Sequence, residues 1–80
     1  MTGRALTARQ REILAHVANG FTNTQIAGLL TLHPRTVNRH LAEVYGRLGA
    51  RDRANAVALA LLVGDLTHDD INPPADRSST

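Results

Sequence analysis

Short local signals mark where three helices begin, and they constrain the fold more than any other feature of the sequence. Thr7 with Gln10, and Thr22 with Gln25, each place a hydroxyl side chain three positions before a glutamine, which is the pattern of a helix capping box. Pro34 suits the first position of a third helix, because a helix leaves that backbone N–H unpaired in any case. A chain with these signals is expected to fold into helices.

Apolar residues at helical spacing follow each of these signals and continue into a further segment. We predict helices over four segments: Ala8–Asn19, Asn23–Leu30, Pro34–Leu48 and Arg53–Val63. Gly20 and Gly49 lie where the first and third of them end, as is typical of glycine in a left-handed helix cap. No segment alternates apolar and polar residues as a half-buried strand does, so the predicted class is all-α.

The charges of the chain are unevenly distributed. Residues 1–60 carry an excess of arginine, whereas residues 61–80 carry an excess of aspartate, and the formal net charge is +2. A basic body is typical of a domain that binds a polyanion, although an ordinary solvated surface fits the same distribution. From Thr67 onward Asp, Asn, Pro and Ser dominate, so we predict a folded domain over 1–66 and an acidic, disordered tail over 67–80.

Several function classes find no support in the sequence. The chain has no cysteine, which excludes disulfides and thiolate zinc sites. His33 and His40 lie about 10 Å apart along a helix axis, too far to share one zinc ion. Asp69 and Asp70 are adjacent carboxylates in a tail that gives them no fixed geometry. We therefore expect no enzyme activity, no catalytic residue, no metal and no cofactor, and no apolar run reaches the ~18–20 residues of a membrane span.

The second and third predicted helices have the pattern of a helix-turn-helix. A short helix is followed by a tight connection whose one apolar residue, Leu32, is expected to enter the core. The longer helix has an apolar face, and its opposite face carries Arg35, Asn38, Arg39, Ala42 and Gly46. Arginine and asparagine hydrogen-bond to base edges in the major groove, and small residues let the helix approach closely. DNA binding is favoured over an ordinary surface helix of a bundle, which the same spacing permits.

Four separated motifs resemble the LuxR-type (GerE-like) helix-turn-helix DNA-binding domain family. They are Leu6–Leu14, Gly20–Ala27, Pro34–Leu41 and Leu48–Val57. The resemblance covers about residues 5 to 66 and implies a four-helix domain with its third helix in the major groove and its fourth at a dimer contact. Many members join this domain to a receiver or signal-binding module, so the chain is either an excised domain or, as the tail favours, a stand-alone regulator.

The resemblance also implies which residues contact DNA. Its base-reading positions fall on Asn38, Arg39 and Ala42. Its phosphate-contacting positions fall on Thr22, Asn23, Thr36 and His40. The first two of these also open a helix, where free backbone N–H groups favour an anion. We expect Arg35 and Arg47 to add phosphate contacts on the flanks of the recognition helix, because each carries a positive charge there.

The predicted fourth helix is apolar on two faces. Its inner face is formed by Ala56, Val57 and Ala60. Its second stripe, at helical spacing, consists of Leu59, Leu62, Val63 and Leu66. A helix that is apolar on two faces is buried on two sides, so we expect this stripe to meet a second copy in a homodimer. In the competing arrangement the acidic tail folds back and Ile71 covers the stripe.

These observations predict a sequence-specific regulator of transcription that binds double-stranded DNA, in the cytoplasm at the nucleoid. The alternative is a protein-interaction module on the same scaffold that contacts RNA polymerase, a sigma factor or another regulator. The neutral side chains at positions 38 and 42 and the apolar second face of the fourth helix keep that alternative open. A duplex-binding affinity that falls with salt would favour the regulator, because phosphate contacts release counterions.

Overall fold

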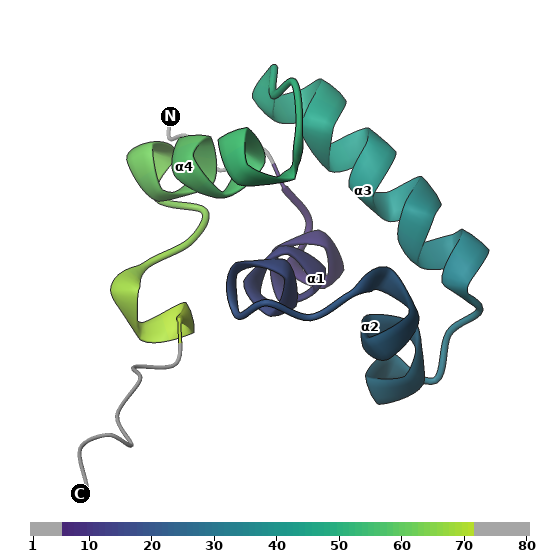
Figure 1. Ribbon diagram of the computed structural model, residues 1–80. Helices are drawn as coiled ribbons and strands as arrows, with labels where there is room; N and C mark the ends of the chain where they lie inside the picture. Colours follow the sequence, from purple (N-terminus) through teal and green to yellow (C-terminus); the bar gives the residue numbers. More distant parts are fainter. Residues whose placement is uncertain (1–5, 72–80) are drawn as a thin grey trace, which may run out of the picture.

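Four α-helices surround one core in the computed structural model, which describes residues 6–71 (Figure 1). They are α1 (Ala8–Ala18), α2 (Asn23–Leu30), α3 (Pro34–Leu48) and α4 (Arg53–Val63), followed by a 3-10 turn, η1 (His68–Asp70). The bounds agree with the four predicted helices, except that α1 ends one residue earlier, with Asn19 as its cap. Within residues 6–71 there is no strand, and the all-α class is confirmed.

Both predicted capping boxes are present. Thr7 accepts a hydrogen bond from the backbone N–H of Gln10 at 3.1 Å, and its own N–H donates to Oε1 of Gln10 at 3.1 Å. Thr22 and Gln25 repeat this exchange at 3.1 and 2.9 Å. Each box satisfies backbone donors that the first turn of a helix leaves unpaired, so the starts of α1 and α2 are fixed within a few residues of sequence.

Three of the four helices end at or next to a glycine. Gly20 and Gly49 adopt φ of 90° and 69°, and Gly64 adopts φ of 86° where α4 ends. L-residues rarely adopt such angles, whereas glycine does so at little cost. The chain therefore reverses at these points and brings the helices back onto one another.

The core lies where α1 meets the other three helices. In Figure 1 α1 occupies the middle of the molecule, with α2 and α3 on one side and α4 on the other, and it contacts all three. The buried apolar side chains are Leu6, Ile13, Leu14, Val17, Ile26, Ala27, Val37, Leu41, Val44, Ala56, Ala60 and Leu66. Leu32 packs against this cluster from the turn, as predicted. The core therefore holds α3 on three neighbours and leaves one of its faces outside.

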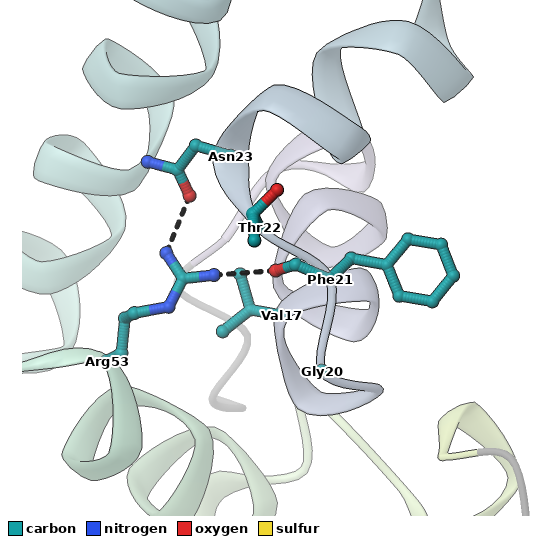
Figure 2. Close-up of a pocket in the computed structure, with 6 residues that line it drawn as sticks. All are labelled: Val17, Gly20, Phe21, Thr22, Asn23 and Arg53. Carbon is teal, nitrogen blue, oxygen red and sulfur yellow. Dashed lines mark hydrogen bonds between the residues drawn. The ribbon is translucent and has the colours of Figure 1, made fainter.

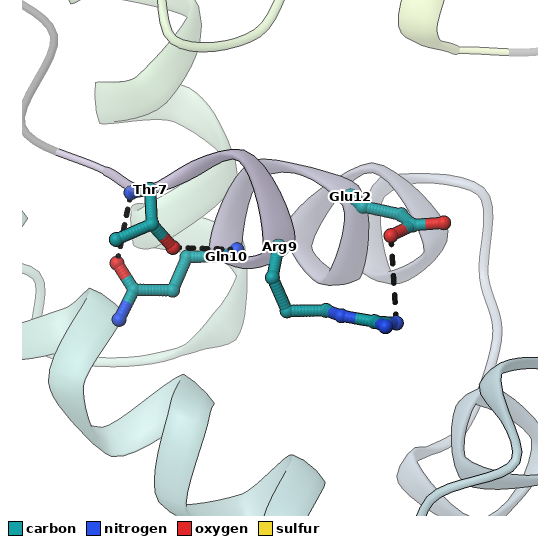
Figure 3. Close-up of polar contacts among 4 residues, drawn as sticks. All are labelled: Thr7, Arg9, Gln10 and Glu12. Carbon is teal, nitrogen blue, oxygen red and sulfur yellow. Dashed lines mark hydrogen bonds and ion pairs between the residues drawn. The ribbon is translucent and has the colours of Figure 1, made fainter.

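A buried polar contact fixes α1 against α3. Gln10 is 2% exposed, and its Nε2 donates to Oε1 of Glu43 at 2.9 Å. Figure 3 shows the same glutamine in the capping box with Thr7, and beside it the ion pair between Arg9 and Glu12, with an N–O distance of 3.5 Å. Both side chains of this ion pair are about half exposed, so it contributes little to stability, ~0–1 kcal/mol. The hydrogen bond between Gln10 and Glu43 therefore links α1 to α3 in addition to their apolar packing.

The position of Leu66 differs from the prediction. We predicted it in the outward stripe of the fourth helix, but its side chain is 1% exposed and belongs to the core. Gly64 ends α4, and the N–H of Leu66 then donates to the carbonyl of Ala60 at 3.1 Å, which turns the chain inward. The helical spacing that placed Leu66 on the stripe does not extend past this glycine.

The first residues of the predicted tail form the turn η1. The carboxylate of Asp70 accepts from the N–H of Thr67 at 2.8 Å, and the side chain of Asn19 donates to the carbonyl of Asp70 at 2.9 Å. The first bond closes the turn η1, and the second attaches it to the end of α1. The part of the tail described, through Ile71, leaves Leu62 80% exposed, so it does not cover the stripe. The rest of the predicted tail, 72–80, lies outside the described residues.

Candidate nucleic-acid interface

The connection between α2 and α3 sets the angle of a helix-turn-helix. Thr31 adopts a left-handed conformation, with φ of 57° and ψ of 46°, which is strained for a β-branched residue. The N–H of Leu32 donates to the carbonyl of Ala27 at 2.9 Å. His33 then caps α3, because its Nδ1 accepts from the N–H of Arg35 at 3.0 Å. The turn thus ends α2 and starts α3 within three residues.

The outward face of α3 carries the three residues predicted to read bases. Asn38, Arg39 and Ala42 are all exposed, whereas Val37 and Leu41 on the opposite face are 0% and 2% exposed. The structure therefore brings the predicted base-reading residues together on one accessible face. A guanidinium group and an amide next to a small residue form a surface that is able to hydrogen-bond to base edges.

The predicted phosphate contacts at the start of α2 are more constrained than the sequence indicated. The hydroxyl oxygen of Thr22 accepts the capping hydrogen bond from the N–H of Gln25, which fixes its position but leaves its O–H able to donate. The side chain of Asn23 is half-buried and is bonded to other side chains at both ends. Backbone N–H groups at a helix start favour an anion, and the first turn of α2 contains no acidic residue to oppose one.

Along α3 the other predicted phosphate contacts differ in exposure. Arg35 and Arg47 are exposed near the two ends of the helix, about 18 Å apart along its axis at ~1.5 Å per residue. That length exceeds the width of a major groove, about 12 Å, which is consistent with the predicted phosphate contacts at the two ends of the helix. Thr36 and His40 are half-buried.

The ring of His40 is covered on one side. Its Nδ1 is buried and has no hydrogen-bond partner within the described part of the chain. A proton on that nitrogen would be a buried donor without an acceptor, which is costly, so the favoured neutral tautomer carries its proton on Nε2. Nε2 is then the ring atom that is able to donate to a phosphate.

A chain of side-chain hydrogen bonds that was not predicted from the sequence joins α4, α2 and α3, and Figure 2 shows its first bond, from Arg53 to Asn23. Arg53, the first residue of α4, donates from Nη1 to Oδ1 of Asn23 at 2.6 Å and from Nη2 to the carbonyl of Phe21 at 2.8 Å. Nδ2 of Asn23 in turn donates to Oδ1 of Asn38 at 2.6 Å. An arginine at the start of a helix interacts unfavourably with the helix dipole. The arginine at the first position of α4 was therefore a sequence feature that indicated a contact outside its own helix.

Within residues 6–71, no group of three His, Asp or Glu side chains lies close enough together to hold a metal ion. None of the described helices has the length and apolar character that crossing a membrane requires. Leu62 and Val63 on α4 remain exposed, at 80% and 49%, with Leu59 half-buried beside them, and these three residues are called the α4 patch below.

Comparisons with known proteins agree with this geometry. A family model described as bacterial regulatory proteins of the luxR family matches residues 4–60. The chain is 47% identical over 64 residues to the probable transcriptional regulatory protein SgaR of Hyphomicrobium methylovorum, a match that covers 80% of this chain and 30% of SgaR. It is 45% identical over 56 residues to the probable transcriptional regulatory protein NarL of Mycobacterium tuberculosis, covering 70% of this chain and 26% of NarL.

A solved structure resembles the fold as well. The Vibrio cholerae VqmA dimer, described in connection with DNA-binding mechanisms of LuxR-type receptors, superposes with a TM-score of 0.70 at 30% identity, covering 75% of this chain and 27% of that one. The chain thus spans less than a third of the length of each of these relatives. Family model, relatives and fold agree: the chain belongs to the luxR family of bacterial regulatory proteins, as a helix-turn-helix DNA-binding domain of a transcriptional regulator and not an enzyme.

Proposed function

We propose that this domain binds specific double-stranded DNA sequences by inserting α3 into the major groove. One observation carries the proposal: Asn38, Arg39 and Ala42 share an exposed face directly opposite the buried face of the same helix. Arg39 is the strongest reader of the three, because its guanidinium group is able to donate two hydrogen bonds to O6 and N7 of guanine. The domain acts in the cytoplasm at the nucleoid, where chromosomal DNA lies.

The test starts by selecting bound sequences from random duplex DNA with the purified chain. The Arg39→Ala variant should then lose about 1–3 kcal/mol of binding free energy on the selected site and relax specificity at one base pair. Arg9→Ala is the matched control, since Arg9 is an exposed arginine of α1 paired with Glu12. Fluorescence anisotropy titrations measure both. An Arg39→Ala variant that binds as tightly and as selectively as the parent would refute the assignment.

The domain is further proposed to dimerise through the α4 patch. The support is the exposure of Leu62 and Val63 on a helix whose other side is in the core, because apolar side chains of this size favour burial. A two-fold dimer would pair each patch with its copy and present two recognition helices to an inverted repeat, with half-sites about one helical turn apart. VqmA, the structural relative, is itself described as a dimer.

The dimer is tested with Leu62→Asp. This variant should keep its helix content by circular dichroism, because the altered side chain is 80% exposed, yet lose most of its affinity for an inverted repeat. Leu29→Asp is the control, since Leu29 is 54% exposed on α2 and lies outside the patch. Sedimentation of the protein–DNA complexes gives the stoichiometry. Unchanged two-to-one binding by Leu62→Asp would refute the interface.

A protein-interaction role on the same scaffold is the second candidate. Arg39 is the only charged residue among the three at the reading positions, and the α4 patch offers an apolar surface to RNA polymerase, a sigma factor or another regulator. Duplex binding that weakens steeply with salt supports the DNA-binding role. Absence of any duplex binding at low salt would favour the interaction role instead.

A further inference from the structure

We propose that Arg53 acts as a positioning residue that fixes which end of the Asn38 side-chain amide faces DNA. This inference rests on the proposed function, in which Asn38 reads a base. It concerns the chain of hydrogen bonds from Arg53 through Asn23 to Asn38, called the amide relay below. The relay starts on α4, passes through the start of α2 and ends on the outward face of α3 (Figure 2 shows its first bond).

The direction of the relay follows from the chemistry of its first member. A guanidinium group has only N–H donors, so the atom of Asn23 that faces Arg53 must be the acceptor, Oδ1. The distance of 2.6 Å between Nη1 and Oδ1 is that of a short, charge-assisted hydrogen bond. A second bond, from Nη2 to the carbonyl of Phe21 at 2.8 Å, holds the guanidinium plane in place. Arg53 thereby determines the orientation of the Asn23 amide.

That orientation passes to the reading helix. With Oδ1 of Asn23 turned to Arg53, its Nδ2 donates to Asn38, and Oδ1 of Asn38 accepts at 2.6 Å. The Nδ2 group of Asn38 keeps both of its N–H donors for another partner. Asn38 is exposed on the outward face of α3, so its fixed amide offers a donor to the groove.

A fixed donor selects among base edges. In the major groove, guanine presents two acceptors, N7 and O6, while cytosine presents the N4 amino group as a donor. The relay therefore predicts that Asn38 prefers a base with an acceptor edge, guanine above all, and rejects cytosine at the same position. The expected preference for a G·C over a C·G base pair there is about five-fold, the equivalent of one hydrogen bond.

The experiment compares base preferences, because a loss of affinity alone does not distinguish a lost base contact from a folding defect. Asn38→Ala first identifies the base pair that Asn38 reads, as the position where preference is lost in selection from random duplex DNA. Asn23→Asp then keeps a partner for Arg53 but presents only acceptors, so Asn38 must turn its Nδ2 inward and its Oδ1 to the groove. The preference at that base pair should invert from G·C to C·G, while the base pair read by Arg39 stays unchanged.

Arg53→Met removes the donor and lets both amides turn, so the preference at the Asn38 position should fall below about two-fold. Arg51→Met is the matched control, because it removes an exposed arginine close in sequence that has no bond to the relay. Circular dichroism checks that each variant is folded. Asn23→Asp tests the relay independently of any folding defect in Arg53→Met.

The outcomes are distinguishable. A selective parent whose preference at the Asn38 position survives both Asn23→Asp and Arg53→Met refutes the relay and leaves the proposed function standing. If the parent is selective and Asn38→Ala changes none of its base preferences, the relay is also refuted, because Asn38 then reads no base. A parent that enriches no sequence refutes the proposed function and this inference with it. Inversion by Asn23→Asp is the result that supports the relay.

Discussion

The hydrogen bond between Gln10 and Glu43 allows a test of how α1 holds α3. Gln10→Glu keeps the capping box, because a glutamate at this position accepts from the N–H of Thr7 as the glutamine does. The same substitution replaces the donor at 2.9 Å from the Glu43 carboxylate with a second carboxylate. It therefore alters the contact between α1 and α3 while leaving the start of α1 intact.

The magnitude follows from two contributions. A hydrogen bond to a charged group is worth about 1.5–3 kcal/mol. Two like charges about 4 Å apart add about 1 kcal/mol in a water-like surrounding and more where water is excluded. Glu43 is exposed but position 10 is only 2% exposed, so about 1 kcal/mol is the lower bound of the repulsion, and we take a sum of about 3 kcal/mol as the minimum expected loss. A domain of this size is stable by only about 4–12 kcal/mol in total and loses ~4–8 °C of Tm per kcal/mol, so Tm should fall by about 12–24 °C.

A double-mutant cycle measured by thermal and urea unfolding isolates this contact. Glu43→Gln alone should cost under about 1 kcal/mol, because a neutral amide oxygen still accepts from Gln10. In the double variant the glutamine at 43 donates to the glutamate at 10, so most of the lost stability should return. Additive effects within about 0.5 kcal/mol would show that the two side chains do not interact, and would refute the reasoning.

Three further predictions follow from single positions. Thr31→Gly should raise Tm by a few degrees. The left-handed conformation costs an L-residue about 1–2 kcal/mol, whereas glycine loses only about 0.5–1 kcal/mol of stability to its greater chain entropy. A lower Tm would contradict this prediction. Leu66→Ala should lower the free energy of unfolding in urea by about 2–5 kcal/mol, whereas Leu62→Ala should change it by less than about 0.5 kcal/mol. Equal losses for the two variants would show that Leu66 is not buried in the core. Arg35→Ala should weaken binding to all duplexes equally and reduce the slope of log K against log salt by about 0.9, whereas a loss at one base pair would make Arg35 a base reader.

The parts of the fold that could be predicted are those encoded by neighbours in sequence. Thr7 and Gln10 specify a helix start within four residues, and the structure contains both of their hydrogen bonds. The glycine at position 49 specifies a helix end through its own conformational freedom, and it adopts φ of 69°. The two faces of α3 follow from the period of its residues, so the exposure of Asn38 and Arg39 was predictable without knowledge of any other helix.

The features that escaped prediction depend on partners far away in sequence or on where a helix stops. The relay bonds join residues 30 and 15 positions apart, and no local pattern identifies Asn23 as the intermediate. Leu66 was misplaced because helical spacing was counted across Gly64, although a left-handed glycine changes the direction of the chain. The contact between the turn η1 and α1 was not predictable for a similar reason, because Asn19 bonds to Asp70 across 51 positions.

The burial of Leu66 also changes what the proposed dimer is able to do. Two large exposed side chains per copy remain, and full burial of each is worth about 1.5–3 kcal/mol, so the four together supply ~6–12 kcal/mol before partial exposure is deducted. Association costs an estimated ~4–15 kcal/mol in lost freedom of motion. The α4 patch therefore supports only weak self-association in free solution. In the proposed dimer on an inverted repeat, DNA would hold the second copy at high effective concentration, so a weak patch would suffice there. Dimerisation and recognition of a two-part site are then one equilibrium, which is why the stoichiometry must be measured on DNA.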